Sequence, residues 1–90
     1  MIEITVSVPN RLGIHARPAA LIVRAAVEYE ADVWISNGEE KVNAKSIMGV
    51  MTLAASGGTS VMVSADGEDA QEAAEAVADV IRSGFGEEML

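Results

Sequence analysis

The stretch that decides the fold is "ADVWISNGEEKVNA" (residues 31–44), in which two short segments with apolar residues flank an Asn-Gly pair. Apolar and polar side chains alternate around Val33 and again at Val42, which is typical of strands that are buried on one side. An Asn-Gly pair between such segments is the strongest short-range signal for a hairpin, since both residues tolerate left-handed backbone. We therefore predict two antiparallel strands joined by a turn at Asn37 and Gly38.

Two other stretches alternate in the same way and add two more strands. In "IEITVSV" (residues 2–8) the apolar residues that share a face are Ile2, Ile4, Val6 and Val8. In "TSVMVSA" (residues 59–65) they are Val61, Val63 and Ala65. Alternation of this kind predicts a sheet with one face packed on the core and the other facing water.

A first helix is predicted to begin at Ala16, directly after the only histidine of the chain, His15. Small and branched apolar residues recur there at helical spacing, and Arg24 lies off that stripe. The stripe is predicted to comprise Ala19, Ala20, Val23, Ala26 and Val27. Such a narrow alanine-rich face allows the helix to approach the sheet closely.

Two further helices are predicted from capping residues and apolar spacing. The second starts at Ser46 as its N-cap and stops at Gly57-Gly58, with apolar residues at Ile47, Val50, Met51 and Leu53. The third starts at Asp69, where Glu72 three residues later would complete a capping box. Its apolar stripe is predicted to be Ala70, Ala73, Ala74, Val77, Val80 and Ile81.

The order β-α-β-β-α-β-α defines the predicted architecture. We expect an α+β open-faced sandwich in which three helices cover one face of a four-stranded antiparallel sheet. No repeat or linker interrupts the 90 residues, so residues 1–90 are predicted to form a single domain.

Composition excludes several classes of function. The net charge of −8 argues against nucleic acid, and the absence of cysteine together with a single histidine excludes thiolate and multi-histidine metal sites. We therefore predict no metal and no cofactor. The opening residues lack the basic and apolar regions of a signal peptide, and no apolar run reaches the ~20 residues of a membrane span, so a cytoplasmic protein without membrane insertion is expected.

The short segment "LGIHARPAA" (residues 12–20) concentrates chemistry at the start of the first helix. The N–H groups of Ala16 and Arg17 have no acceptor within a helix that begins there. Pro18 has no N–H group, so placing it in this first turn costs no helical hydrogen bond. With the helix dipole and the guanidinium, the two N–H groups would form an anion site beside the imidazole of His15. We expect these positive surroundings to keep the ring neutral and nucleophilic, which suits a histidine that accepts a phosphoryl group and passes it on.

The ordinary explanation stays open at this point, because a lone histidine near a helix start is commonly only a surface or capping residue. Arg17 alone is typical of a solvated cation, and Pro18 alone of a helix start. The cations are nevertheless unevenly distributed, with Arg82 the only one in the second half of the chain. One face of an otherwise acidic body is therefore predicted to be locally positive.

The string "GIHARPAA" (residues 13–20) resembles the active-site signature of the HPr family, the histidine-containing phosphocarriers of the bacterial phosphotransferase system. "AKSIMG" (residues 44–49) is similar to the segment around that family's regulatory serine, and the resemblance extends over residues 1 to 86. It implies that His15 accepts phosphate on Nδ1 from enzyme I, charged by phosphoenolpyruvate, and donates it to enzyme IIA domains, with Arg17 steadying the phosphoryl group. Such a protein is a carrier and not a stand-alone catalyst.

The resemblance also implies docking and regulatory sites. Enzyme I and enzyme IIA would dock on the start of the first helix, on Arg24, and on an apolar patch of Ile47, Met48 and Met51. Because helical spacing cannot bury all three patch residues, at least one is expected to be exposed, and Met48 is our first choice. Ser46 corresponds to the residue that HPr kinase/phosphorylase modifies in some bacteria, although a serine there is also an ordinary N-cap.

A phosphocarrier is the leading hypothesis, and the sequence leaves alternatives open beside it. The nitrogen-branch carriers (NPr) have nearly the same motif. A regulatory interaction protein gated by Ser46 is a second class of function. The paralogue Crh lacks the histidine, so His15 favours a carrier. An unrelated α+β binding module with an incidental histidine is a third class. The family leads us to expect a monomer. The terminal stretch "RSGFGEEML" (residues 82–90) runs a few residues beyond the usual last helix, so the family's role for a C-terminal carboxylate near the active centre is not assigned to any residue here.

Overall fold

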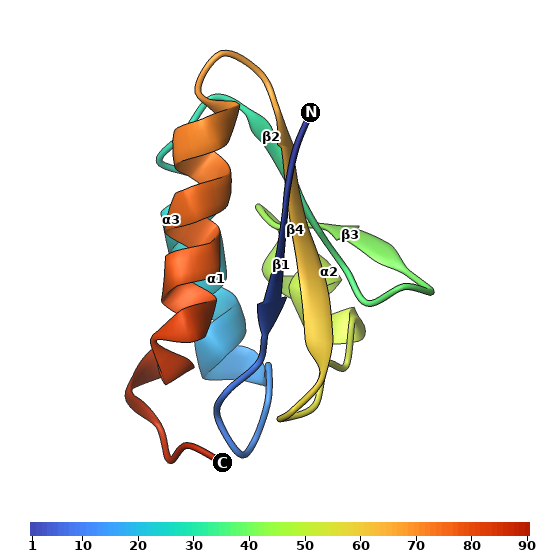
Figure 1. The fold of residues 1–90 in the computed structure, drawn as a ribbon, viewed down its shortest axis with the longest axis vertical. Coiled ribbons are helices and arrows are strands. Elements are labelled where there is room, and N and C mark those ends of the chain that lie inside the picture. The colour runs from blue at the N-terminus through green and yellow to red at the C-terminus, as the bar shows by residue number, and fades with distance from the viewer.

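A computed structural model describes all 90 residues, and it confirms the predicted order of strands and helices (Figure 1). The elements are β1 (Ile2–Ser7), α1 (Ala16–Ala26), β2 (Asp32–Ser36), β3 (Lys41–Asn43), α2 (Ile47–Thr52), β4 (Ser60–Asp66), α3 (Ala70–Arg82) and a final 3-10 turn η1 (Gly84–Gly86). The final turn is the one element that the sequence did not predict. No helix is both long and apolar enough to span a bilayer.

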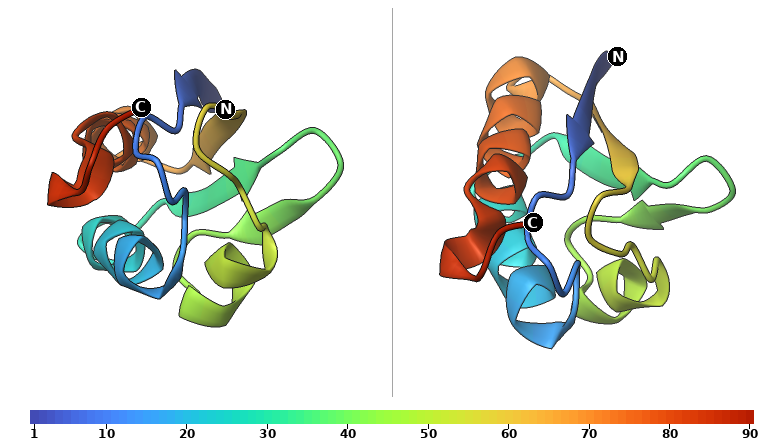
Figure 2. Two further views of the ribbon diagram at one scale, coloured as in Figure 1. Left: turned by 90° about the horizontal axis from the view of Figure 1, so that it is seen from below. Right: turned by 60° about the horizontal axis from the view of Figure 1, so that its bottom comes forward.

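The four strands form one antiparallel sheet in the order β1-β4-β2-β3, and the helices lie on one side of it (Figures 1 and 2). The registers place Ile4 and Ile35 on either side of Val63, so apolar residues of three strands meet on the covered face. Val63 and Ile35 are fully buried there. The predicted open-faced sandwich is therefore confirmed.

The β2–β3 hairpin forms where it was predicted, but its loop is longer than a two-residue turn. Ser36 pairs with Lys41, which leaves four residues in the loop. The side-chain oxygen of Asn37 accepts hydrogen bonds from the backbone nitrogens of Glu39 and Glu40 at 3.0 and 2.9 Å. This Asx-type bonding closes the longer loop.

The buried stripe of α1 differs from the predicted one. Its fully buried residues are Pro18, Ala19, Ile22 and Ala26. Ala20 and Val23 are only partly buried, and Val27 is the exposed C-cap. Ala19 and Ala26 of the predicted stripe are buried as expected, and Ile22, three residues after Ala19 and four before Ala26, completes this face in place of Val23.

One predicted helix end and one predicted capping interaction are also wrong, although α3 starts after Asp69 as predicted. α2 stops at Thr52, because Ala54 takes a positive φ of 53° and ends the helix before Gly57-Gly58. In α3 the N-cap Asp69 makes no capping hydrogen bond, so the predicted capping box with Glu72 does not form. Ala78, and not Val80, completes the buried stripe of α3.

Candidate functional site

The loop between β1 and α1 carries His15 to one end of the molecule, where it meets the C-terminal residues and the segment after α2 (Figure 2). The backbone nitrogen of Ile14 donates to the carbonyl oxygen of Ala55 at 2.9 Å, which fixes the loop just before His15. Gly13 has a φ of 73°, and a Cβ there would lie only 2.3 Å from the same oxygen. Glycine at this position therefore allows the two backbones to approach.

α1 begins at Ala16, as predicted, and His15 is its N-cap. Its carbonyl oxygen accepts from the backbone nitrogen of Ala19 at 2.9 Å, whereas the N–H groups of Ala16 and Arg17 donate to no other backbone group. Pro18 is buried in the first turn, and that turn contains no acidic residue. The helix therefore presents two unpaired amides and the positive end of its dipole next to the imidazole.

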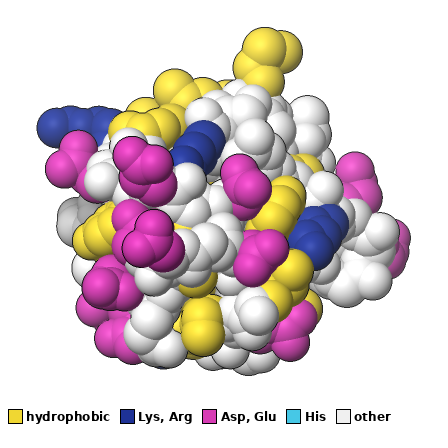
Figure 3. Space-filling view, turned by 90° about the horizontal axis from the view of Figure 1, so that it is seen from above, with side chains coloured by type: hydrophobic (Ala, Val, Ile, Leu, Met, Phe, Trp, Pro, Cys, Tyr) yellow, Lys and Arg dark blue, Asp and Glu magenta, His cyan; other side chains and the backbone are white.

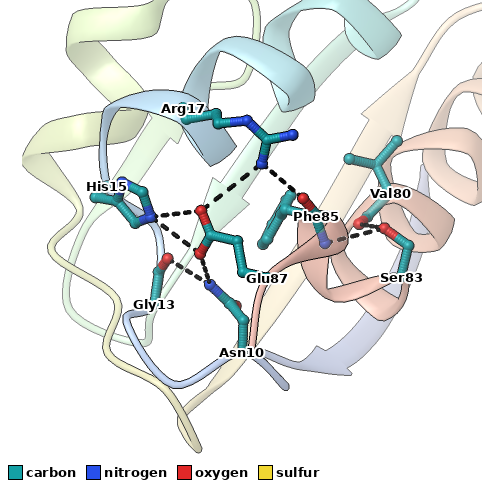
Figure 4. A network of polar contacts seen from close by, with 8 residues as sticks. All are labelled: Asn10, Gly13, His15, Arg17, Val80, Ser83, Phe85 and Glu87. Carbon is teal, nitrogen blue, oxygen red and sulfur yellow. Dashed lines mark hydrogen bonds and ion pairs between the residues drawn. The ribbon is translucent and has the colours of Figure 1, made fainter. Parts of the chain in front are cut away.

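A carboxylate faces the imidazole, which the sequence did not indicate (Figure 4). Nε2 of His15 lies 2.8 Å and 3.0 Å from the two side-chain oxygens of Glu87. The same carboxylate accepts from Nδ2 of the buried Asn10 at 3.0 Å and lies 3.7 Å from Nη1 of Arg17. The expectation of purely positive surroundings for His15 is therefore wrong.

The contacts around Glu87 keep it ionised. The hydrogen bond from His15 is the main reason that the pKa of Glu87 lies below its ordinary value, and the hydrogen bond from Asn10 and the charge of Arg17 act in the same direction. The Glu87 side chain is 16% exposed, compared with 40% for His15. An anion is thus already present beside the ring at neutral pH.

The turn η1 places both Glu87 and Arg17 by reversing the chain after α3. Gly84, Phe85 and Gly86 all have positive φ values, and the Phe85 side chain is buried. The carbonyl oxygen of Phe85 accepts from Nη1 of Arg17 at 2.7 Å. The Arg17 side chain is 62% exposed, so its other donors face solvent. Two glycines flanking the one phenylalanine were the available sequence signal for this turn.

The other predicted site residues lie on α2 and at the end of α1, which are neighbours (Figure 2). Ser46 is confirmed as the N-cap of α2, and its hydroxyl oxygen accepts from the backbone nitrogen of Gly49 at 3.0 Å. Ile47, Met48 and Met51 are exposed by 44%, 78% and 44%, so Met48 is the most exposed, as expected. Arg24 is exposed in the last turn of α1.

Charge is distributed unevenly between the two ends of the molecule. Figure 3 shows the end opposite His15, where Asp and Glu side chains predominate. Exposed acidic residues of the elements that meet there include Glu30, Asp32, Asp66 and Glu68. At the His15 end Arg11 and Arg17 each have a glutamate nearby, so the predicted positive face is partly neutralised.

The groups around His15 can bind an anion, and the imidazole can attack it as a nucleophile. The exposed ring supplies a nucleophile, the amides of Ala16 and Arg17 and the guanidinium supply donors, and no pocket encloses them. A phosphoryl group held by another macromolecule can therefore reach this site.

Comparisons with known proteins match nearly the whole chain. A family model described as "PTS HPr component phosphorylation site" matches residues 2–83. The phosphocarrier protein HPr of Neisseria meningitidis is 39% identical over 87 residues, which are 97% of this chain and 98% of that protein.

Two solved structures show the same architecture. HPr from Thermoanaerobacter tengcongensis has a TM-score of 0.92 at 48% identity, covering 99% of this chain and 100% of that one. Crh of Bacillus subtilis, described as a dimer with a swapped domain, has a TM-score of 0.75 at 46% identity, covering 93% and 97%.

Proposed function

This chain belongs to the HPr family of the phosphotransferase system, and we propose that its His15 accepts a phosphoryl group from phosphorylated enzyme I and donates it to enzyme IIA domains. The single observation that carries the proposal is the position of His15 as N-cap of α1, beside the unpaired amides of Ala16 and Arg17. Phosphoenolpyruvate is the ultimate donor, and the protein is a carrier in the cytoplasm.

The residues of the first turn have distinct roles in this proposal. Nδ1 of His15 is the attacking atom, because Nε2 faces Glu87. The amides of Ala16 and Arg17 and the Arg17 guanidinium bind the phosphoryl oxygens, since charge-assisted hydrogen bonds are the stronger kind. Pro18 supports the site by fixing the backbone of the first turn.

The partners are proposed to dock across α1 and α2. Ile47, Met48 and Met51 form an exposed apolar patch, and Arg24 adds a cation on the neighbouring helix. Apolar side chains exposed together on a monomer's surface commonly mark a protein interface. One surface would serve enzyme I and enzyme IIA in turn.

The test is phosphorylation with purified enzyme I and phosphoenolpyruvate, followed by intact-protein mass spectrometry. We expect one acid-labile phosphoryl group that is absent from His15→Ala, and transfer of that group to an enzyme IIA domain. Running the sugar-branch and nitrogen-branch forms of enzyme I in parallel distinguishes an HPr from an NPr. Modification that persists in His15→Ala would refute the proposal.

Regulation through Ser46 is a second, separate proposal. The hydroxyl of Ser46 caps α2 directly before the patch of Ile47, Met48 and Met51, so a phosphate there would add negative charge beside the docking surface. HPr kinase/phosphorylase would be the partner. Incubation with ATP and this kinase should give an acid-stable phosphoserine that is absent from Ser46→Ala, and an unmodified chain would reject regulation while leaving the carrier role intact.

We also propose that residues 1–90 act as one domain and as a monomer. The support is that the sheet and its three helices enclose one core of 22 buried residues within a single chain. Light scattering on the purified protein should give the mass of one chain. A mass of two chains would instead match the dimeric arrangement described for Crh.

A further inference from the structure

We infer that Glu87 is a positioning residue for His15. Its carboxylate fixes the ring proton on Nε2 and leaves Nδ1 as the nucleophile, and a C-terminal strap formed by Glu87–Leu90 holds it in place. The inference rests on the proposed phosphoryl transfer for its consequence, but the proton position can be measured without any transfer.

The geometry at Nε2 determines which ring nitrogen carries the proton. An ionised carboxylate can only accept hydrogen bonds, so at 2.8 Å from Glu87 the Nε2 atom must be the donor. Nδ1 has no hydrogen-bond partner in the protein, and the side chain is 40% exposed. In a neutral imidazole only one nitrogen is protonated, so the lone pair lies on Nδ1 and faces solvent.

Glu87 is itself held rigidly by the chain around it. The side-chain nitrogen of Asn10, which is fully buried, donates to Oε1 of Glu87 at 3.0 Å and to the carbonyl oxygen of Gly13 at 2.8 Å. One amide group thereby joins the carboxylate to the loop that carries His15. The lowered pKa of Glu87 agrees with a carboxylate that receives several hydrogen bonds.

The strap continues beyond Glu87 as a short antiparallel pairing with residues 9–11, in the loop that follows β1. The backbone nitrogen of Arg11 donates to the oxygen of Glu88 at 2.8 Å, and the nitrogen of Leu90 donates to the oxygen of Pro9 at 2.9 Å. Asn10 and Met89 form a bridge between these bonds. Backbone hydrogen bonds therefore hold the C-terminal residues on either side of the Asn10–Met89 bridge, at Glu88 and at Leu90.

A glycine in η1 leaves room for this strap. A Cβ on Gly84 would lie 2.2 Å from Sδ of Met89, so the chain after α3 can fold back only if this position lacks a side chain. The strap is therefore packed as well as hydrogen-bonded.

The transfer step needs no proton movement at His15 when Glu87 holds the proton. The Nδ1 lone pair forms a bond to the phosphorus of a phosphohistidine donor, and the donor's N–P bond breaks with its electron pair returning to the donor nitrogen. The ring then carries the phosphoryl group on Nδ1, the proton on Nε2 and a positive charge that faces Glu87. On transfer to an acceptor nitrogen the N–P electrons return to Nδ1 and restore the neutral ring.

Three other charged groups surround this pair and enter any pH dependence. Arg17 lies 3.7 Å from the Glu87 carboxylate, and Arg11 lies 3.9 Å from Glu88 on the strap. Glu88 faces Arg11 and makes no contact with the imidazole. Glu88→Gln is therefore a matched control that removes a neighbouring charge without touching His15.

The decisive experiment is ¹⁵N NMR of the His15 ring in the full chain at alkaline pH, where imidazole rings are neutral. The original chain and Glu88→Gln should both show the proton on Nε2. In Glu87→Gln, Asn10 still donates to the amide oxygen, so the amide nitrogen takes the place of Oε2, the oxygen that lies nearer to Nε2 at 2.8 Å, and donates to Nε2. The share of the ring protonated on Nδ1 should then rise, and an unchanged share would overturn the inference.

Phosphorylation by enzyme I provides the second readout. Glu87→Gln should slow the phosphorylation of His15 by about tenfold, the effect of one hydrogen bond to a charged group, while Glu88→Gln should not. An altered tautomer with an unaltered rate would overturn the positioning role. If the original chain is not phosphorylated at all, the carrier proposal fails, and the NMR result still decides where Glu87 holds the proton.

Removing residues 88–90 tests the strap separately from the carboxylate. Glu87 then remains, but the bonds to Pro9 and Arg11 are lost. We expect a mixture of the two tautomers, and a spectrum identical to that of the full chain would show that Asn10 alone positions Glu87 and would refute the strap.

Discussion

The carboxylate of Asp69 lies 2.8 Å from the backbone nitrogen of Ala31, and this contact joins the start of α3 to the loop between α1 and β2. The backbone nitrogen of Glu30 donates to the other oxygen at 2.9 Å. On the same loop Nζ of Lys45 donates to the oxygen of Tyr29 at 2.8 Å. The hydrogen bond from Glu30 is the main reason that the pKa of Asp69 lies below its ordinary value.

Replacing Asp69 with Asn should lower the melting temperature at neutral pH by roughly 4–8 °C, because Asn has one acceptor for two backbone donors and carries no charge. Since the pKa of Asp69 is depressed by folding, its contribution is present above the unfolded pKa and is lost as the pH falls through the folded value. The difference between the two proteins should therefore shrink as the pH falls below the ordinary pKa of an aspartate and vanish only below the lowered folded value, in thermal melts followed by circular dichroism.

Glu68→Gln is the control for that prediction, since Glu68 is an exposed neighbour without a hydrogen bond in the structure. It removes the same charge and should change the melting temperature much less at every pH. Equal effects of the two substitutions would show that the loss of a negative charge changes the stability, and that the hydrogen bonds to Asp69 do not contribute.

Two glycines with positive φ allow a matched test of the loop that carries His15. Gly13→Ala introduces a Cβ that meets the Ala55 oxygen and the backbone of Ser56, whereas Gly38→Ala adds a Cβ with nothing within 4 Å. Gly38→Ala should lose about 1–2 kcal/mol of unfolding free energy from strain alone. Gly13→Ala should lose at least about 3 kcal/mol, because the backbone clash adds to the strain.

Urea unfolding of the two alanine variants measures this difference directly. Gly13→Ala should also slow phosphorylation of His15, since Ile14 can no longer reach Ala55. If both variants are destabilised equally, the close approach at Gly13 does not hold the loop.

The sheet could be predicted because apolar and polar side chains alternate along its strands. Each strand can be recognised from this pattern within a few residues. The start of α1 at His15 and the cap at Ser46 followed in the same way, since capping is decided within a few residues. The contact between His15 and Glu87 could not be predicted, because it joins residues 72 apart through a turn with left-handed Phe85. Asp69 shows the same limit: its local pattern matched a capping box, but two distant amides bind the carboxylate instead.

The cap of α2 gives a third prediction. Ser46→Ala removes the acceptor for the Gly49 nitrogen and should lower the free energy of unfolding by about 1 kcal/mol. Ser46→Asn should retain most of the stability, because Asn is an equally good N-cap. Ser7→Ala is the control, since Ser7 is exposed on β1 and its side chain makes no hydrogen bond in the structure.

Chemical unfolding measured for these three variants separates capping from the loss of a hydroxyl. A Ser46→Ala protein as stable as the original chain would mean that the Gly49 contact contributes nothing. A Ser46→Asn protein as unstable as Ser46→Ala would show that Asn does not replace the serine cap here.

The exposed patch on α2 gives the last prediction. Met48 is 78% exposed, so Met48→Ala removes little buried contact and should leave the stability of the free protein unchanged. If enzyme I or enzyme IIA docks there, the substitution should weaken binding by about tenfold, because a truncated interface anchor loses more than 1 kcal/mol.

Val27→Ala is the matched control for Met48, because Val27 is also apolar and 53% exposed but lies at the far end of α1 from His15. Calorimetric titration should give it the same dissociation constant as the original chain. Equal weakening by both substitutions would place the partners elsewhere on the surface. Weakening by Met48→Ala alone, with an unchanged tautomer at His15, would separate docking from the chemistry of the ring.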